Sequence, residues 1–396
     1  MAFYKFSVTE MNMRSLVVLV MAFFIGAAFT DVAAVRPVHA QQQEQAQKSA
    51  QTLARLMKPW PVESRDSGGV LLLSDSPEYL AEYGILYSDV IKGDARVFYY
   101  HVNVMDRPGK LAVVVENMGS QRTQVVVERS AMPEPDFNYL QLGKNTQISY
   151  MRIPQPERKI PLEPGSRNLL HPLMGAELVE PQRLVSGMYD ISASEPVKVS
   201  VVFCPARSNP VEFVQHARVL PKDKVALRGT FKGMNRTISA KSAYDPQRDG
   251  LVYIPLGDDE YDRYKHGVDA TDGSQAVNYG NYGVMYRLEL PTMGSQPVQV
   301  MLTPLGGVYA GAVRVEEDRQ LAKVVHNPTG RLFFGDVTPA NLELHLGKNV
   351  ILTSDFELSH MGSYKPNRNF ALQYSPPGAS NLPVLVILAP DNYSVK

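Results

Sequence analysis

Short runs of β-branched and aromatic residues recur along most of this chain, and clusters of turn-forming residues separate them. Before residue 215 the runs cover 95–104, 110–116, 123–128, 146–153 and 196–203. After residue 220 they cover 225–231, 251–254, 284–290, 298–303, 308–315, 323–326, 350–358 and 384–388. Strands of about 5–8 residues between Gly, Pro, Asn and Asp clusters are typical of a sandwich or a barrel. The pattern therefore predicts an all-β protein made of antiparallel β-sandwiches, Ig-like or jelly-roll-like.

Two sandwich domains are expected within the 396 residues. A stretch rich in proline and charge, 205–224 (PARSNPVEFVQHARVLPKDK), predicts a linker. The domains would then span 61–215 and 220–396, each of ordinary sandwich size. The sequence LQLGKN at 140–145 resembles LHLGKN at 344–349. This similarity indicates either an internal duplication or chance.

Residues 1–40 have the features of a signal peptide. Lys5 and Arg14 precede an uncharged run, 15–30, which is short for a membrane span of about 20 residues. Val38 and Ala40 offer a cleavage site before Gln41, and a second candidate site follows Ala34. An uncleaved anchor is the alternative. Since no second long apolar run follows, we expect no transmembrane segment in the mature chain and a location that is secreted, extracytoplasmic or at the cell surface.

Residues 41–60 are expected to form a short amphipathic helix or linker. Within 43–58, Ala46, Ala50, Leu53, Ala54 and Met57 recur at helical spacing. Pro59 would end the helix, because the residue before a proline avoids the helical region.

Most catalytic motifs are missing from the sequence. It has no G-x-S-x-G, H-E-x-x-H, P-loop or dinucleotide-binding glycine motif. The eight histidines are scattered, and the only cysteine, Cys204, follows a strand-like run, which favours a buried thiol. The 40 basic and 40 acidic residues balance, so a nucleic-acid partner is not expected. A pair of carboxylates in a hydrolase remains open, because such pairs are spatial.

The stretch 255–282 is the most unusual in composition, and it is long for a loop between sandwich strands. It contains four tyrosines that are candidate ligand-binding residues: Tyr261, Tyr264, Tyr279 and Tyr282. It also contains four candidate calcium ligands: Asp258, Asp259, Asp262 and Asp269. A recognition loop, a calcium site and a solvated loop without a ligand are the three interpretations. No other cofactor is expected.

Two segments resemble a known group of proteins. The runs at 280–290 (GNYGVMYRLEL) and 74–89 (SDSPEYLAEYGILYSD) resemble secreted Firmicutes proteins that carry the label copper amine oxidase N-terminal-like (stalk) domain. The resemblance implies a surface-exposed, non-catalytic module. It does not imply amine oxidation, because those oxidases need N-Y-[DE] and H-x-H motifs. The Asn-Tyr pairs here are followed by Leu, Gly, Gly and Ser, and no H-x-H occurs.

The sequence thus predicts a secreted, non-catalytic binding or structural protein of the cell envelope. An envelope component or a glycan would be its partner. The alternative is a secreted hydrolase that acts on envelope polysaccharide, with acidic residues from loops at one end of a sandwich.

Overall fold

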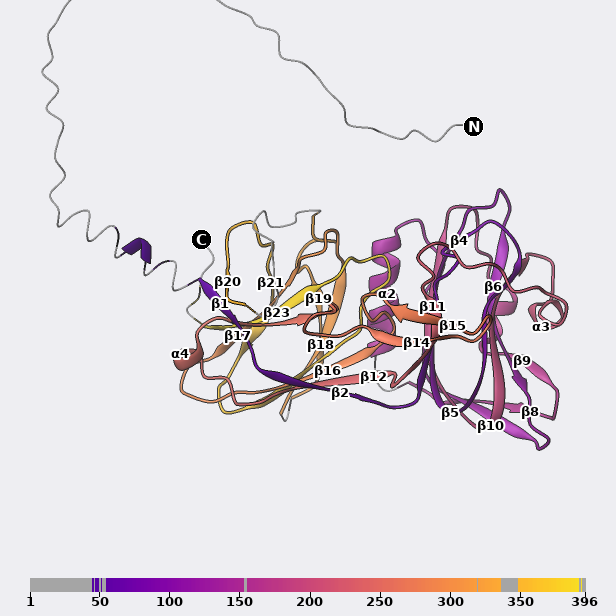
Figure 1. The fold of residues 1–396 in the computed structure, drawn as a ribbon, viewed down its shortest axis with the longest axis horizontal. Coiled ribbons are helices and arrows are strands. Elements are labelled where there is room, and N and C mark those ends of the chain that lie inside the picture. Colours follow the sequence, from indigo (N-terminus) through magenta and orange to yellow (C-terminus); the bar gives the residue numbers. More distant parts are fainter. Residues whose placement is uncertain are drawn as a thin grey trace, which may run out of the picture. The chain divides into compact units, whose positions relative to one another are not determined.

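A computed structural model describes residues 45, 47–49, 51, 55–152, 155–318, 320–335, 348–391 and 393. The predicted signal peptide, 1–40, lies outside the described residues. So does most of 344–349, the second copy of the similar hexapeptides. The described residues from 51 onward belong to one compact unit, and the sheets described below lie in it (Figure 1).

The strands form three sheets among the described residues. The largest contains β3 (Val70–Ser74), β4 (Tyr79–Leu80), β5 (Gly84–Asn103), β6 (Gly109–Asn117), β7 (Thr123–Ala131), β8 (Arg158–Leu162), β9 (Arg167–Leu169), β10 (Leu184–Pro205), β11 (Arg228–Lys232), β14 (Lys265–Asp269) and β15 (Ser274–Asn278). The second contains β1 (Leu56–Pro59), β13 (Val252–Leu256), β17 (Val298–Pro304), β20 (Val350–Ile351), β21 (Ser359–Tyr364) and β23 (Val384–Pro390). The third contains β2 (Val62–Ser67), β12 (Asn235–Ala240), β16 (Met285–Pro291), β18 (Gly311–Glu317), β19 (Lys323–Asn327) and β22 (Asn369–Tyr374).

Helices are few and short among the described residues. Besides the helical residues 45, 47–49 and 51, they are α2 (Tyr139–Met151), α3 (Pro210–Phe213), α4 (Pro246–Asp249) and the 3₁₀ helix η1 (Pro172–Gly175). Helix α2 contacts β7 and β10 of the largest sheet and β18 of the third (Figure 1). No described helix is long and apolar enough to cross a membrane.

The all-β prediction is confirmed, and the sheets are mixed rather than purely antiparallel. Strand β3 runs parallel to β5, and β12 runs parallel to β16. The longest strands, β5 and β10, pair antiparallel along most of their length, with a register shift between Ala193 and Val197. On the far side of β10, its two halves pair with different strands, β7 and β6. Strand β10 is therefore shared by two parts of the sheet, which meet at the register shift.

Strand pairing crosses the predicted boundary between residues 215 and 220. Strand β2 pairs with β12, and β3 pairs with β11. The predicted linker contains α3, and it is bonded to β5 through the Leu220 N–H and the Ile85 carbonyl, 2.8 Å apart. The largest buried cluster includes Leu71 and Leu142 as well as Tyr286 and Val386. The described sheets therefore do not separate at 215–220, and the independence of the two predicted domains stays a prediction.

The strand predicted at 146–153 is wrong, because residues 139–151 form helix α2. The Asn138 side chain accepts from the Gln141 N–H and caps the helix. Its buried positions, Leu142, Gly143, Lys144, Thr146, Gln147, Tyr150 and Met151, follow helical spacing. The buried Gln147 amide donates to the Ser375 carbonyl and accepts from the Ala312 N–H, both at 2.6 Å. Tertiary contacts thus decide the structure of a segment rich in β-formers.

Two other segments also differ from expectation. The helix expected over 43–58 ends earlier, because Leu56–Pro59 forms β1, which pairs with β13 and β20. Residues 45, 47–49 and 51 are helical. The expected loop 255–282 contains the antiparallel hairpin β14–β15, whose first strand pairs with β11. Its mixed sequences, KHGVD and SQAVN, lack the apolar runs by which other strands are recognised.

Candidate functional site

The candidate site is a pocket of ≈ 470 Å³, which we call the tyrosine–carboxylate pocket. Its volume is within the range of small-ligand sites. Seven side chains define its chemistry: Asp75, Glu78, Asp223, Tyr79, Tyr100, Tyr139 and Tyr282. No described lining residue is a lysine, arginine or histidine. The pocket therefore combines aromatic surface with uncompensated acidic groups.

Asp223 has a structural role at the edge of this pocket. One carboxylate oxygen accepts from the N–H groups of Val225 and Ala226, and the other accepts from the Glu78 N–H at 3.0 Å. Burial alone would raise the pKa of Asp223, but these hydrogen bonds outweigh it, and the pKa is lowered. Asp223 is thus an ionised carboxylate whose hydrogen bonds join the segments 76–78 and 223–226.

Asp75 and Glu78 have environments that oppose their charge. The Asp75 Oδ1 atom is buried and has no hydrogen-bond partner. Burial, followed by the nearby charges of Glu78 and Asp223, raises the pKa of Asp75 well above its ordinary value. Burial and the charge of Asp223 also raise the pKa of Glu78. Glu78 has a hydrogen bond with Tyr79 that partly offsets this rise, whereas the Asp75 Oδ1 lacks the partner that an ionised carboxylate requires.

His101 holds the segment that carries these acids. Its Nδ1 lies 2.9 Å from the Pro77 carbonyl, and its Nε2 lies 2.9 Å from the Ser74 hydroxyl. A carbonyl only accepts, so Nδ1 carries the proton and Nε2 accepts from Ser74. Burial lowers the pKa of His101 to about 4, and the imidazole is neutral at physiological pH.

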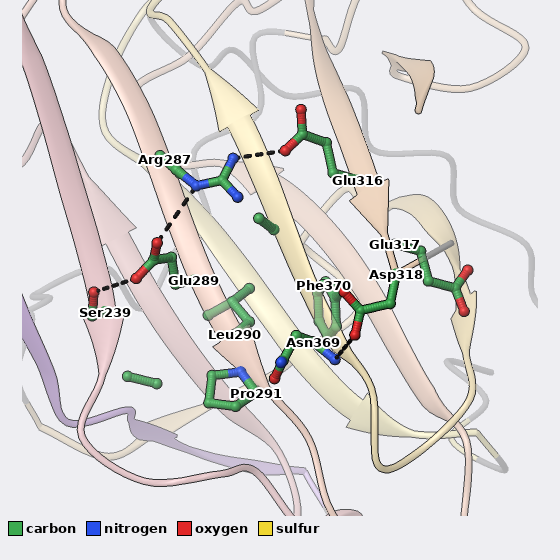
Figure 2. Close-up of a pocket in the computed structure, with 12 residues that line it drawn as sticks. Ser239, Arg287, Glu289, Leu290, Pro291, Glu316, Glu317, Asp318, Asn369 and Phe370 are labelled. Carbon is green, nitrogen blue, oxygen red and sulfur yellow. Dashed lines mark hydrogen bonds and ion pairs between the residues drawn. The ribbon is translucent and has the colours of Figure 1, made fainter. Parts of the chain in front are cut away.

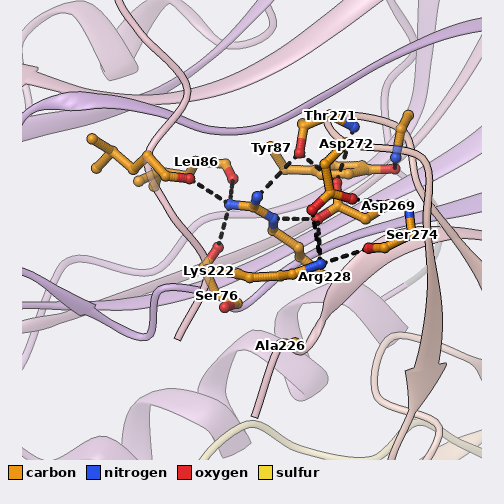
Figure 3. Close-up of polar contacts among 12 residues, drawn as sticks. Ser76, Leu86, Tyr87, Lys222, Ala226, Arg228, Asp269, Thr271, Asp272 and Ser274 are labelled. Atoms are coloured by element: carbon orange, nitrogen blue, oxygen red, sulfur yellow. Dashed lines mark hydrogen bonds and ion pairs between the residues drawn. The ribbon is translucent and has the colours of Figure 1, made fainter. Parts of the chain in front are cut away.

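Arg228 of β11 contacts the same segment through the carbonyl of Ser76 (Figure 3). The buried guanidinium donates to the carbonyls of Ser76 (3.4 Å), Leu86 (3.1 Å) and Leu220 (2.8 Å). Its charge is balanced by Asp269, whose Oδ2 lies 2.7 Å from Nε. Arg228 therefore joins three separate backbone segments near the pocket without lining it.

The four predicted ligand-binding tyrosines are not gathered in one site. The Tyr261 hydroxyl donates to the Trp60 carbonyl, and the Tyr264 hydroxyl contacts the Gly257 carbonyl. Tyr279 is 51% exposed and packs edge-on against Tyr264. Only Tyr282 lines the tyrosine–carboxylate pocket, where its hydroxyl donates to the Ser380 carbonyl at 2.7 Å.

The four candidate calcium ligands are occupied by protein groups. Asp258 accepts from the N–H groups of Tyr261 and Asp262, and Asp259 accepts from that of Tyr264. Asp262 receives the guanidinium of Arg236 at 2.5 Å, whereas Asp269 receives that of Arg228. Among the residues that the structure describes, no group of three or more His, Cys, Asp or Glu could hold a metal ion.

A second pocket, of ≈ 580 Å³, lies on the third sheet. Figure 2 shows Arg287 of β16 between Glu316 of β18 and Glu289 of β16, at 2.6 and 3.5 Å. Ser239 of β12 also donates to Glu289 at 2.9 Å. Because these charges are paired with one another, this groove has the character of a solvated sheet face.

The sequence prediction missed the acids and most tyrosines of the pocket. They come from positions 75–79, 100, 139 and 223, which are far apart in sequence and meet only through the fold. The only local signal is DSPEY at 75–79, where two acids and a tyrosine follow a buried strand. The predicted buried thiol agrees with the structure: Cys204 is buried in β10, and burial raises its pKa to about 11.

Comparisons with known proteins identify no family. No protein-family model matches the chain, and no curated protein matches it. Among solved structures, it is similar to vicilin from Solanum lycopersicum (tomato), at 9% identity and a TM-score of 0.14, over 86% of each chain. It is also similar to PNGF-II, at 9% identity and a TM-score of 0.19, over 93% of this chain and 71% of that one. Likenesses at this level carry no functional argument.

Proposed function

We propose that the protein is a secreted, non-catalytic binding or structural protein of the cell envelope, and that its ligand enters the tyrosine–carboxylate pocket. The observation that carries the binding role is the buried, unpaired Asp75 Oδ1. Most buried polar atoms have a partner, and because Asp75 also lines the pocket, a ligand that binds there can supply one to its carboxylate. A β-sheet scaffold that presents such groups on loops is a common design for recognition.

The test is co-sedimentation of the purified protein with isolated envelope material. Replacing Tyr79, which is 55% exposed, by Ala removes a ring from the pocket without disturbing the core. Asp75→Asn removes the unpaired carboxylate. We expect each variant to be retained at least fivefold less than the wild type.

Tyr279→Ser is the matched control, because Tyr279 is similarly exposed but does not line the pocket. Its retention should equal that of the wild type. Loss with Tyr279→Ser alone would place binding at the 255–282 segment instead. Full retention of both pocket variants would show that the pocket does not bind the envelope material.

Export follows from the N-terminal sequence and has its own test. N-terminal sequencing of material from the culture medium or cell surface should begin at or near Gln41. A protein that still begins before Ser15 would contradict cleavage and favour the anchor.

A hydrolase is the second candidate, and one observation favours it. The raised pKa values of Asp75 and Glu78 favour the protonated form, which a general acid needs. Wild-type protein would then release new reducing ends from envelope polysaccharide, and Glu78→Gln would not. If the wild type binds envelope polysaccharide but releases no reducing ends, the hydrolase is excluded and the non-catalytic binding role is favoured.

A further inference from the structure

The charge of the tyrosine–carboxylate pocket is entirely negative among its described lining residues. Asp75, Glu78 and Asp223 contribute acids, and no basic side chain lines the wall. The charges of Glu78 and Asp223 raise the pKa of Asp75, and the charge of Asp223 raises that of Glu78, which a hydrogen bond with Tyr79 partly lowers. Such a site disfavours anions and stabilises a cation that enters it.

The hydrogen-bonding need of the pocket is for a donor. Both oxygens of Asp223 are already engaged by backbone N–H groups. The Asp75 Oδ1 is buried and unpaired, and an ionised carboxylate can only accept. A ligand that carries N–H groups would supply what Asp75 lacks.

The aromatic walls also suit a positive charge. Tyr79, Phe98, Tyr100, Tyr139 and Tyr282 all line the pocket. A cation that lies within about 6 Å of an aromatic ring face is attracted by the ring quadrupole. A bare metal ion is a poorer fit, because no described cluster has the side chains to coordinate one.

We infer that the tyrosine–carboxylate pocket binds a primary alkylammonium group, which donates to the carboxylate of Asp75 and lies against the tyrosine rings. This inference rests on the proposed binding function and names its ligand chemistry. A free polyamine, a lysine side chain and a deacetylated amino sugar all carry the group.

Binding should depend on pH through the two acids. Asp75 and Glu78, whose pKa values are raised, must release protons to pair with the cation. Asp223 is ionised throughout, because its pKa is lowered. The pKa values of Tyr79, Tyr100, Tyr139 and Tyr282 are raised, so these side chains stay neutral. Affinity should therefore rise with pH as these acids ionise, and His101, whose pKa is about 4, stays neutral at physiological pH.

The experiment is calorimetric titration of the purified protein with three probes of similar size. Butylammonium carries charge and N–H donors, 1-butanol lacks the charge, and choline lacks the ammonium donors. At pH 8 we expect butylammonium to bind at least tenfold more tightly than either of the others. Titrations in buffers of different ionisation enthalpy should show proton release on binding.

Variants assign the preference to the pocket. Asp75→Asn should reduce the preference for butylammonium over 1-butanol to less than twofold and remove most of the proton release. Tyr79→Ala should weaken butylammonium binding, whereas Tyr79→Phe, which keeps the ring, should not. Glu212→Gln is the control, because Glu212 is exposed on α3 and does not line the pocket.

Three further probes distinguish the sources of the group: spermidine, Nα-acetyl-lysine amide and glucosamine, the last compared with N-acetylglucosamine. The tightest of them identifies the source. Equal binding of 1-butanol, or choline as tight as butylammonium, would overturn the inference while leaving the proposed binding function intact. If no amine binds, the inference is also overturned. The proposed binding function is then tested only by the co-sedimentation experiment with envelope material.

Discussion

Asp75 is a residue whose surroundings favour its neutral form. Its Oδ1 is buried and unpaired, and two other acids lie near it. An unsatisfied buried polar group costs about 1–3 kcal/mol. The pocket therefore reduces the stability of the free protein, a cost that is common where a fold is shaped for binding.

Asp75→Asn should stabilise the free protein at pH 7. The folded-state pKa of Asp75 is raised, so the native state binds more protons than the unfolded state above the unfolded pKa of about 3.9. Stability is consequently lost as the pH rises through this window, and the variant escapes the loss. We expect a gain on the order of 1 kcal/mol at pH 7 in urea unfolding, vanishing near pH 3. A loss at pH 7 would mean that the ionised carboxylate has a partner.

His101 predicts the opposite dependence on pH. Its pKa falls from 6.5 to about 4 on folding, so the unfolded state binds more protons between these values. Stability should decline by about 3 kcal/mol as the pH falls from 6.5 to 4. His101→Gln should be less stable at pH 7, with a shallower decline in urea unfolding over this range. An unchanged slope would show that other groups carry it.

Helix α2 packs through a glycine. A Cβ atom at Gly143 would lie 2.0 Å from the Gly378 carbonyl oxygen, and one at Gly378 would lie 2.6 Å from the Tyr100 ring. The helix, the 378–381 segment and the pocket tyrosine are therefore in close contact. Strand β5 supplies Tyr100, so the position of this pocket residue depends on how α2 packs.

Gly143→Ala should destabilise the protein although alanine favours helices by about 1 kcal/mol over glycine. The backbone carbonyl cannot yield as a side chain would, and overpacking costs about 1–3 kcal/mol or more. Asn145→Ala, on the exposed side of the same helix, should change the free energy of unfolding by less than about 0.5 kcal/mol. Thermal unfolding of both variants checks this, and a stabilised Gly143→Ala would contradict the packing.

The elements that the sequence predicted well are those with dense apolar runs. Strands β6, β17 and β23 lie where their β-branched residues place them. Helix α2 was missed because its buried face includes Thr146, Gln147 and Tyr150, which look like strand residues until their tertiary partners are known. The pocket was missed for a similar reason. Tyr282 was singled out by local composition, but nothing in the sequence joins it to Asp75 or Glu78.

At the scale of the whole molecule, buried ionic contacts tie distant parts of the chain together. Arg96 of β5 forms two hydrogen bonds with Asp190 of β10, at 2.7 and 3.0 Å. It also donates to the Met234 carbonyl at 2.6 Å and to the Asn235 side chain at 3.0 Å. Such contacts cross the predicted boundary at 215–220, as the strand pairs β2–β12 and β3–β11 do.

The described unit should therefore unfold in a single cooperative transition. Removing the second half would leave β2 without its described partner β12 and would take β11 from β3. Removing the first half would take one neighbour each from β11 and β12, so neither half is expected to stay folded alone. Calorimetric and van't Hoff enthalpies should agree, and circular dichroism and tyrosine fluorescence should give coincident transitions. Two resolved transitions, or two stable fragments after proteolysis between 205 and 224, would instead support two separate domains.

The residues that line the tyrosine–carboxylate pocket are far apart in sequence, and this determines when the pocket can form during synthesis. Its lining begins at Asp75 and is not complete until Asn381. A nascent chain is made from its N-terminus, so every residue up to Asn381 must be synthesised before the lining is complete. No contiguous peptide, and no truncation product that ends before Asn381, should therefore compete for the ligand.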